Sequence, residues 1–225
     1  MTFRFRDRRQ AGRQLAAQLV AYANRPDVLV LVLRRGGVPV AFEVARGLDA
    51  PLDVFLVHRL GVPGREALAM GAITTGGIVV RDDAIVDTLG IPDHILATVA
   101  ADEQQELERR EHAYRGDRLP PEVRGRVAIL VDDGHASAVA MHAAVTALRQ
   151  QQPVQLVVAV PIAAPEIYDT LRAEADAIVC AITPESFDTV DRWYDDRAQP
   201  TDDEIRDLLE RAAREHAGLA RAYSA

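Results

Sequence analysis

The chain has 225 residues, 48% of them hydrophobic, so it is long enough to bury the core of one full domain and too short for two large ones. Its formal net charge of -8 disfavours a nonspecific nucleic-acid binder, because such proteins usually present a basic surface. All 26 basic residues are arginine, which excludes Schiff-base chemistry and leaves arginine and backbone amides to hold any phosphate.

Cysteine content and hydropathy predict the compartment. The single cysteine, Cys180, cannot form an intramolecular disulfide and lies in an apolar run, so we interpret it as a buried core residue in a reducing cytoplasm. Residues 1–13 are rich in arginine and have no apolar signal core. No stretch of about 18 apolar residues is present for a membrane span. We expect a soluble, cytoplasmic protein with no membrane or nucleic-acid partner.

The predicted core elements alternate between strands and helices. Short apolar runs rich in β-branched residues are typical of strands buried on both faces; they lie at 28–33, 54–57, 127–131, 156–160 and 178–182. Helical patterns follow at 38–47, 139–149 and 165–174. The alternation predicts an α/β fold with a doubly wound, mostly parallel sheet and right-handed crossovers.

Two segments interrupt this alternation between the second and third strands. Residues 70–81 predict a hairpin with Thr75-Gly76-Gly77 as its turn, and residues 92–115 a charged helix with Glu106 and Arg110 paired on its exposed face. At the C-terminus, Thr201 and Glu204 form a capping box before an amphipathic helix. We expect a single domain over 1–225, with a small hood built from roughly 1–25 and 183–225.

The most informative segment is residues 129–141, where an apolar strand ends in Asp132 and Asp133 and runs through small residues into a helix. In an open parallel sheet, ligands bind beyond the carboxyl ends of the strands. The helix N-terminus that follows offers unpaired amides and a partial positive charge, which suit a phosphate. The alternative is that the acidic pair simply caps the helix that begins near Ser137.

Residues 131–141 resemble the ribose-phosphate loop of type I phosphoribosyltransferases, in which two acidic residues precede Thr-Gly-x-Thr. The resemblance implies that Asp132 and Asp133 are catalytic, facing the ribose hydroxyls of phosphoribosyl pyrophosphate and favouring an oxocarbenium-like transition state. It implies that the following loop binds substrate through Gly134, His135, Ala136, Ser137, Ala138, Val139 and Ala140.

The loop departs from the family pattern where the 5-phosphate would bind. Thr-Gly-x-Thr has become Ser137-Ala138-Val139-Ala140, so Ala138 adds a methyl group and Ala140 lacks a hydroxyl donor. Each lost bond to a charged oxygen costs about 1.5–3 kcal/mol, which predicts weakened phosphate binding.

Two further segments resemble the same family. Arg35, Gly36 and Gly37 follow the first strand and match a pyrophosphate loop; glycines there permit close backbone approach or positive φ, although a plain strand-helix turn remains the alternative. His58-Arg59-Leu60-Gly61-Val62-Pro63-Gly64 resembles an Arg-Lys-Leu-Gly-Val-Pro-Gly segment. Arg59 is therefore expected to hold pyrophosphate, and His58 is interpreted as a strand-end residue rather than a catalyst. The hairpin would be a mobile cover or, alternatively, a dimer arm.

The acceptor is not specified by the sequence. Ala136 stands where purine-salvage members carry an aspartate, which disfavours 6-oxopurine activity. Trp193 and Tyr194 are base-pocket candidates, although such rings are more often core or interface residues. His135 is either a local acid or base or an exposed loop residue. The resemblance implies Mg²⁺ held mainly through substrate oxygens, with no dedicated cage of protein metal ligands. We expect a homodimer, which the hairpin and the charged helix could build.

Two functions remain open from the sequence. The first is transfer of a phosphoribosyl group to a nitrogenous base or related acceptor with release of pyrophosphate. The second is a catalytically weak or inactive relative that binds a nucleotide or phosphoribosyl pyrophosphate as a sensor or regulatory module. A dinucleotide-dependent dehydrogenase is disfavoured because no Gly-x-Gly-x-x-Gly follows the first strand.

Overall fold

A computed structural model describes residues 4–134, 137–184, 187 and 189–222. Its centre is a five-stranded sheet in the order β2-β1-β6-β7-β8, and all neighbouring strands run parallel. The strands are β1 (Val28–Val32), β2 (Leu52–Val54), β6 (Val127–Val131), β7 (Gln155–Ile162) and β8 (Ala177–Ile182). The predicted doubly wound α/β fold is confirmed.

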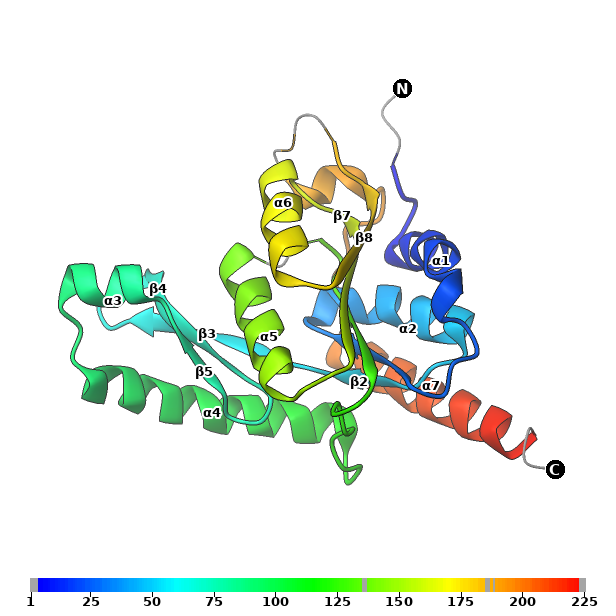
Figure 1. The fold of residues 1–225 in the computed structure, drawn as a ribbon, viewed down its shortest axis with the longest axis horizontal. Helices are drawn as coiled ribbons and strands as arrows, with labels where there is room; N and C mark the ends of the chain where they lie inside the picture. The colour runs from blue at the N-terminus through cyan, green and yellow to red at the C-terminus, as the bar shows by residue number, and fades with distance from the viewer. Residues whose placement is uncertain (1–3, 135–136, 185–186, 188, 223–225) are drawn as a thin grey trace.

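Helices cover both faces of this sheet (Figure 1). One face carries α1 (Arg8–Gln18), α2 (Val38–Leu48) and α7 (Asp202–Ala222); the other carries α5 (Ala138–Gln150) and α6 (Pro165–Glu174). The continuous apolar runs explain this arrangement, because successive residues of a strand point to opposite faces. Val30 belongs to the core on the α2 side, and its neighbour Leu31 to the core on the α5 side.

The insertion after β2 projects to one side of the core (Figure 1). It consists of an antiparallel sheet and two helices: β3 (Val57–Val62), β4 (Arg65–Thr74), β5 (Val79–Arg81), α3 (Asp83–Leu89) and α4 (Asp93–Arg115). Gly76 and Gly77 have φ of 84° and 75°, so the β4–β5 turn needs the left-handed conformations that glycine adopts freely. The predicted turn and the charged helix are confirmed.

The predicted second core strand, 54–57, is wrong in its bounds. The core strand ends at Val54, which pairs with Val32, and Val57 already pairs with Thr74 in the insertion. Between them the backbone N–H of Leu56 donates to Thr75 Oγ1 at 2.8 Å. Residues 54–57 therefore cross from the core sheet to the sheet of the insertion. Their side chains pack against the apolar clusters on both faces of the core sheet.

Cys180 is half-buried rather than part of a sealed core, which corrects the sequence interpretation. Every residue of β8, an edge strand of the sheet, is partly exposed. Burial raises the pKa of the Cys180 thiol, so it remains protonated near neutral pH. Among the described residues, no helix is long and apolar enough to cross a membrane.

The two terminal regions meet above the carboxyl edge of the sheet. Phe5 forms a parallel β-bridge with Tyr194, just after the short 3-10 helix η3 (Val190–Trp193). Phe5 and Tyr194 also anchor a small apolar cluster with Ile162 of β7. Further on, α7 packs into the main core through Ile205, Leu208, Leu209 and Ala212.

Candidate active site

A cleft of about 920 Å³ opens at the carboxyl edge of the sheet, between the core and the insertion. Its described lining residues are Leu33, Arg34, Arg35, Gly36, Leu56, Val57, His58, Arg59, Glu103, Glu106, Arg110, Tyr114, Asp133, Ser137, Ala140 and Gln199. Six of these were expected from sequence, and they come from three segments: the loop after β1, strand β3, and the loop after β6 with the first turn of α5. Sequence reasoning missed the contributions of α4 and of Gln199.

The glycines after β1 allow the two core loops to touch. A Cβ atom on Gly36 would overlap Asp133 Oδ2, and one on Gly37 would lie 3.2 Å from the Cα of Asp132. Gly37 has φ of -73°, so positive φ is not the reason for glycine at this position. Close backbone approach accounts for both glycines, and it joins the expected pyrophosphate loop to the acidic loop.

Asp133 is held in a buried ion pair with an arginine from near the N-terminus of the chain. Arg8 Nε donates to Asp133 Oδ2 at 2.8 Å, and the two side chains are 4% and 1% exposed. Arg8 Nη1 also donates to the carbonyl of Ala198 at 3.0 Å. Separation by 125 residues left no local signal for this contact in the sequence.

Tyr194 fixes the backbone of the same aspartate. Its hydroxyl donates to the carbonyl of Asp133 at 2.9 Å, and the Arg8 guanidinium lies 5.0 Å from its ring centroid. Burial, with a further contribution from the charge of Asp133, raises the pKa of Tyr194 well above its usual range, so the hydroxyl stays a donor.

Tyr194 is fully buried and Trp193 packs beside the same apolar cluster. Neither of these described residues lines the cleft, and their assignment to a base pocket stays a prediction.

The rest of the acidic loop is also specified locally. Gly134 donates its N–H to Asp132 Oδ2 at 2.9 Å and has φ of 99°. A Cβ atom there would lie 2.7 Å from the carbonyl oxygen of Ile162, so glycine is required for both conformation and space. His135 and Ala136 lie outside the described residues.

Ser137, not the acidic pair, caps α5. Its side chain accepts the N–H of Ala140 at 3.2 Å, and Ser137 is the N-cap residue. The interpretation of Asp132 and Asp133 as simple helix caps is therefore wrong. Ala138 and Val139 form the first turn of α5 beside the cleft.

The arginine after β1 is held by the C-terminal segment. Arg35 Nη2 donates to the carbonyl of Pro200 at 3.0 Å and lies 3.4 Å from Asp202 Oδ1. The hydroxyl of Tyr114, on α4, donates to the same Asp202 oxygen at 2.9 Å. Burial and this hydrogen bond raise the pKa of Tyr114. Asp202 thus joins the loop after β1 to the start of α7.

The insertion forms the opposite wall of the cleft. Arg59 lies on β3, not at the end of a core strand, and donates to the carbonyls of Glu66 and Ala67. Glu106 accepts from Arg109 and Arg110, and these bonds lower the pKa of Glu106 to about 2. The predicted pair of Glu106 and Arg110 is confirmed, but it borders the cleft rather than open solvent alone.

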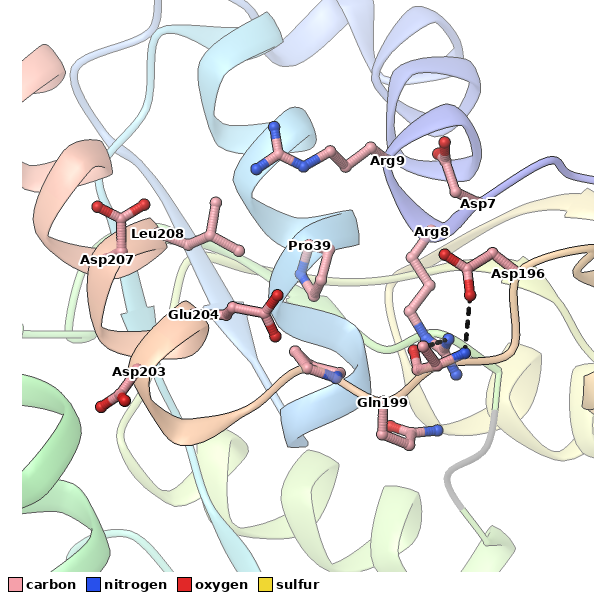
Figure 2. Close-up of a pocket in the computed structure, with 12 residues that line it drawn as sticks. Asp7, Arg8, Arg9, Pro39, Asp196, Gln199, Asp203, Glu204, Asp207 and Leu208 are labelled. Atoms are coloured by element: carbon pink, nitrogen blue, oxygen red, sulfur yellow. Dashed lines mark hydrogen bonds between the residues drawn. The ribbon is translucent and has the colours of Figure 1, made fainter.

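A second cavity, of about 580 Å³, adjoins the first (Figure 2). Gln199 lines both, and Arg8 reaches from α1 towards it in Figure 2. Most of its charged lining is acidic: Asp7, Asp196, Asp203, Glu204 and Asp207, with Arg8 and Arg9. Its charge therefore contrasts with the arginine-bearing loop after β1.

The fold and this cleft define an α/β protein with a site at the carboxyl edge of its sheet. The phosphoribosyl transferase domain model matches residues 5–191, and the chain belongs to that family.

The chain is 41% identical over 215 residues to the Mycobacterium tuberculosis H37Rv protein named "Putative phosphoribosyl transferase Rv0571c". That match covers 95% of this chain and 48% of the relative, so the chain spans about half the length of the curated relative. The fold of this chain is similar to the crystal structure of TT1426 from Thermus thermophilus, with a TM-score of 0.80 and 39% identity. The match covers 92% of this chain and 98% of that one.

Proposed function

We propose that the cleft binds phosphoribosyl pyrophosphate and transfers its phosphoribosyl group to a nitrogenous base or related acceptor, releasing pyrophosphate. The observation that carries this proposal is the contact between the two core loops: Gly36 lies against Asp133 because no side chain separates them. A pyrophosphate at the first loop and a ribose at the second would then be neighbours, as they are in the substrate.

Each part of the substrate has a candidate group. Asp132 and Asp133 would stabilise positive charge that develops at the ribosyl centre. Arg35 and Arg59 would bind pyrophosphate oxygens, and a guanidinium binds such oxygens in pairs. Ser137 and the first amides of α5 would bind the 5-phosphate, helped by the helix dipole.

The residues at the cleft fit a Mg²⁺ that arrives with the substrate. The described carboxylates there already have partners: Asp133 with Arg8, Glu103 with His58, and Glu106 with two arginines. A hard cation would therefore take most of its oxygen ligands from pyrophosphate and ribose, and would neutralise part of their charge.

A second candidate function is a weak or inactive relative that binds the same ligand as a sensor. The N-terminus of α5 favours it, because Ser137 Oγ already accepts the N–H of Ala140 and position 140 offers no hydroxyl. The two candidates share a ligand and differ in turnover.

Pyrophosphate release is the direct test. The protein with Mg²⁺ and phosphoribosyl pyrophosphate is assayed against a panel of purine and pyrimidine bases, alongside Asp132→Asn/Asp133→Asn. Base-dependent release by the wild type and its loss in the variant support the transferase. Turnover that survives in the variant contradicts the assignment, and ligand binding without turnover favours the sensor.

A further inference from the structure

His58 faces the cleft with one ring nitrogen fixed and the other available. Its Nδ1 lies 2.9 Å from Glu103 Oε2 of α4, and its side chain is 12% exposed. Both residues line the cleft. Nε2 has no hydrogen-bond partner among the described residues. A carboxylate that accepts from Nδ1–H fixes the ring and its tautomer, and this leaves Nε2 to exchange a proton with a ligand.

The surroundings of His58 favour an anionic ligand. Arg59 is its neighbour on β3, and the loop after β1 brings two more arginines to the same cleft. The charged groups that share the cleft with the His58–Glu103 pair are Arg34, Arg35, Arg59, Glu106, Arg110 and Asp133. Glu106 is paired with Arg109 and Arg110, Asp133 with Arg8, and Arg35 with Asp202. The described lining of the cleft thus carries four arginines and three carboxylates, Glu103 included.

We propose that His58 is a catalytic residue on the pyrophosphate side of the cleft, donating a proton from Nε2 to the departing pyrophosphate while Glu103 orients its ring. This inference rests on the proposed function and deepens it. The sequence alone favoured a strand-end histidine; the contact with Glu103 is what changes that interpretation.

The proton balance of the step is complete. The acceptor nitrogen forms a bond to C1 of the ribose, and the C1–O bond breaks with its electron pair passing to the pyrophosphate oxygen. The Nε2 proton of His58 moves to pyrophosphate, and the acceptor loses its own proton to solvent. His58 then regains a proton from solvent. Such proton transfer contributes about 10²–10⁴-fold to rate.

The chain supplies a matched control for this pair. His142 Nδ1 lies 2.8 Å from Glu174 Oε1, which is close to the distance between His58 and Glu103. His142 is 52% exposed on α5 and belongs to a different surface hollow, not to the cleft lining. His142→Asn therefore removes an equivalent histidine–carboxylate contact without touching the site.

Turnover against pH separates a proton donor from a structural residue. In the wild type and in His142→Asn, pyrophosphate release should fall as pH rises and the donor loses its Nε2 proton. His58→Asn should lose about 100-fold at the low-pH plateau and also lose that alkaline fall. Glu103→Gln, compared with Glu174→Gln, should show an intermediate loss. Equal rates and equal pH profiles for His58→Asn and His142→Asn would overturn the inference.

A binding experiment tests the same group without an acceptor. Magnesium pyrophosphate is titrated calorimetrically in two buffers of different ionisation enthalpy, which gives the protons taken up on binding. The wild type and His142→Asn should take up more protons than His58→Asn and bind about 10-fold more tightly. Equal proton uptake by the two variants contradicts the proposed role of His58 but not the proposed function. No pyrophosphate binding by the wild type contradicts the proposed function, and the inference with it. Thermal midpoints verify folding, and His58→Gln replaces any variant that unfolds.

Discussion

The two walls of the cleft are built in opposite ways. On the core side, Asp133 is buried and held through both its side chain and its backbone, by Arg8 and Tyr194. On the insertion side, the contact of Glu103 with His58 and the ion pairs of Glu106 are partly open to solvent. A buried, hydrogen-bonded pair is costly to break, whereas an exposed pair contributes little. The core wall is therefore preorganised, and the insertion wall is the one suited to rearrange around a ligand.

Breaking the core wall should have the largest effect on stability. Arg8→Met leaves the Asp133 carboxylate buried without its cation, and we expect a loss of about 3–5 kcal/mol in the free energy of unfolding. Urea denaturation at neutral pH measures it. Arg9→Met is the matched control on α1, because Arg9 is 42% exposed and lies 3.7 Å from Glu43.

A double-mutant cycle identifies the partner. Arg8→Met should cost much less in an Asp133→Asn background, because the carboxylate that needed the cation is then neutral. Additive losses in the cycle would show that Arg8 stabilises the fold through other contacts.

Restoring the family loop should tighten substrate binding. Ser137→Thr/Ala138→Gly/Ala140→Thr returns a hydroxyl and a close backbone approach, and each regained bond to phosphate contributes about 1.5–3 kcal/mol. We expect the Kd for phosphoribosyl pyrophosphate to fall by about tenfold or more. Ala138→Gly alone controls for the loss of helix propensity. No gain in affinity would contradict the explanation by a weakened loop.

Releasing the arginine after β1 should have a smaller effect. Asp202→Asn removes the carboxylate that competes for Arg35, so phosphoribosyl pyrophosphate should bind a few-fold more tightly, as calorimetry would measure. Asp203→Asn is the neighbouring control, since Asp203 is 87% exposed and pairs with Arg206. Weaker binding in Asp202→Asn would mean that Asp202 orients Arg35 for the ligand instead of competing with it.

The ion pairs of Glu106 on the insertion wall should have the smallest effect on stability, seen only in acid. The pKa of Glu106 is lowered to about 2 from an ordinary 4.5, so its ion pairs stabilise the fold above about pH 4.5 and are lost as pH falls towards about 2. In Glu106→Gln this part of the acid loss should disappear, which thermal midpoints from neutral pH to about pH 3 would reveal. Glu108→Gln, whose described partner is Gln104, is the control. If the thermal midpoints of Glu106→Gln and the wild type fall equally with pH in acid, the ion pairs of Glu106 do not stabilise the fold as described.

The same contrast separates what the sequence could predict from what it could not. The sheet, the flanking helices and the convergence of Arg35, Gly36 and Asp133 follow from local patterns and from the rule that carboxyl ends of parallel strands share one edge. The predicted bounds of the second strand are wrong because the apolar run 54–57 crosses a junction between two sheets. An apolar run does not show where one strand ends and the next begins.

The missed site residues depend on long-range contacts. Arg8 contacts Asp133 although it lies 125 residues before it in the sequence, and Tyr194 contacts it from 61 residues after it. The sequence predicts a solvent-exposed face for the charged helix α4. That face is turned to the cleft, and residues that line a polar cleft have the same polar sequence pattern as residues exposed to solvent. Its only sequence signal was the pair of Glu106 and Arg110.

The most direct test is a calorimetric titration of phosphoribosyl pyrophosphate with Mg²⁺ into the wild type, Arg35→Gln and Arg46→Gln. Arg46 is the matched control, a half-exposed arginine on α2 that pairs with Glu43 away from the cleft. The proposed site predicts micromolar binding by the wild type and Arg46→Gln, and binding at least about tenfold weaker by Arg35→Gln. Absence of binding by the wild type, or equal affinities for all three proteins, would contradict it.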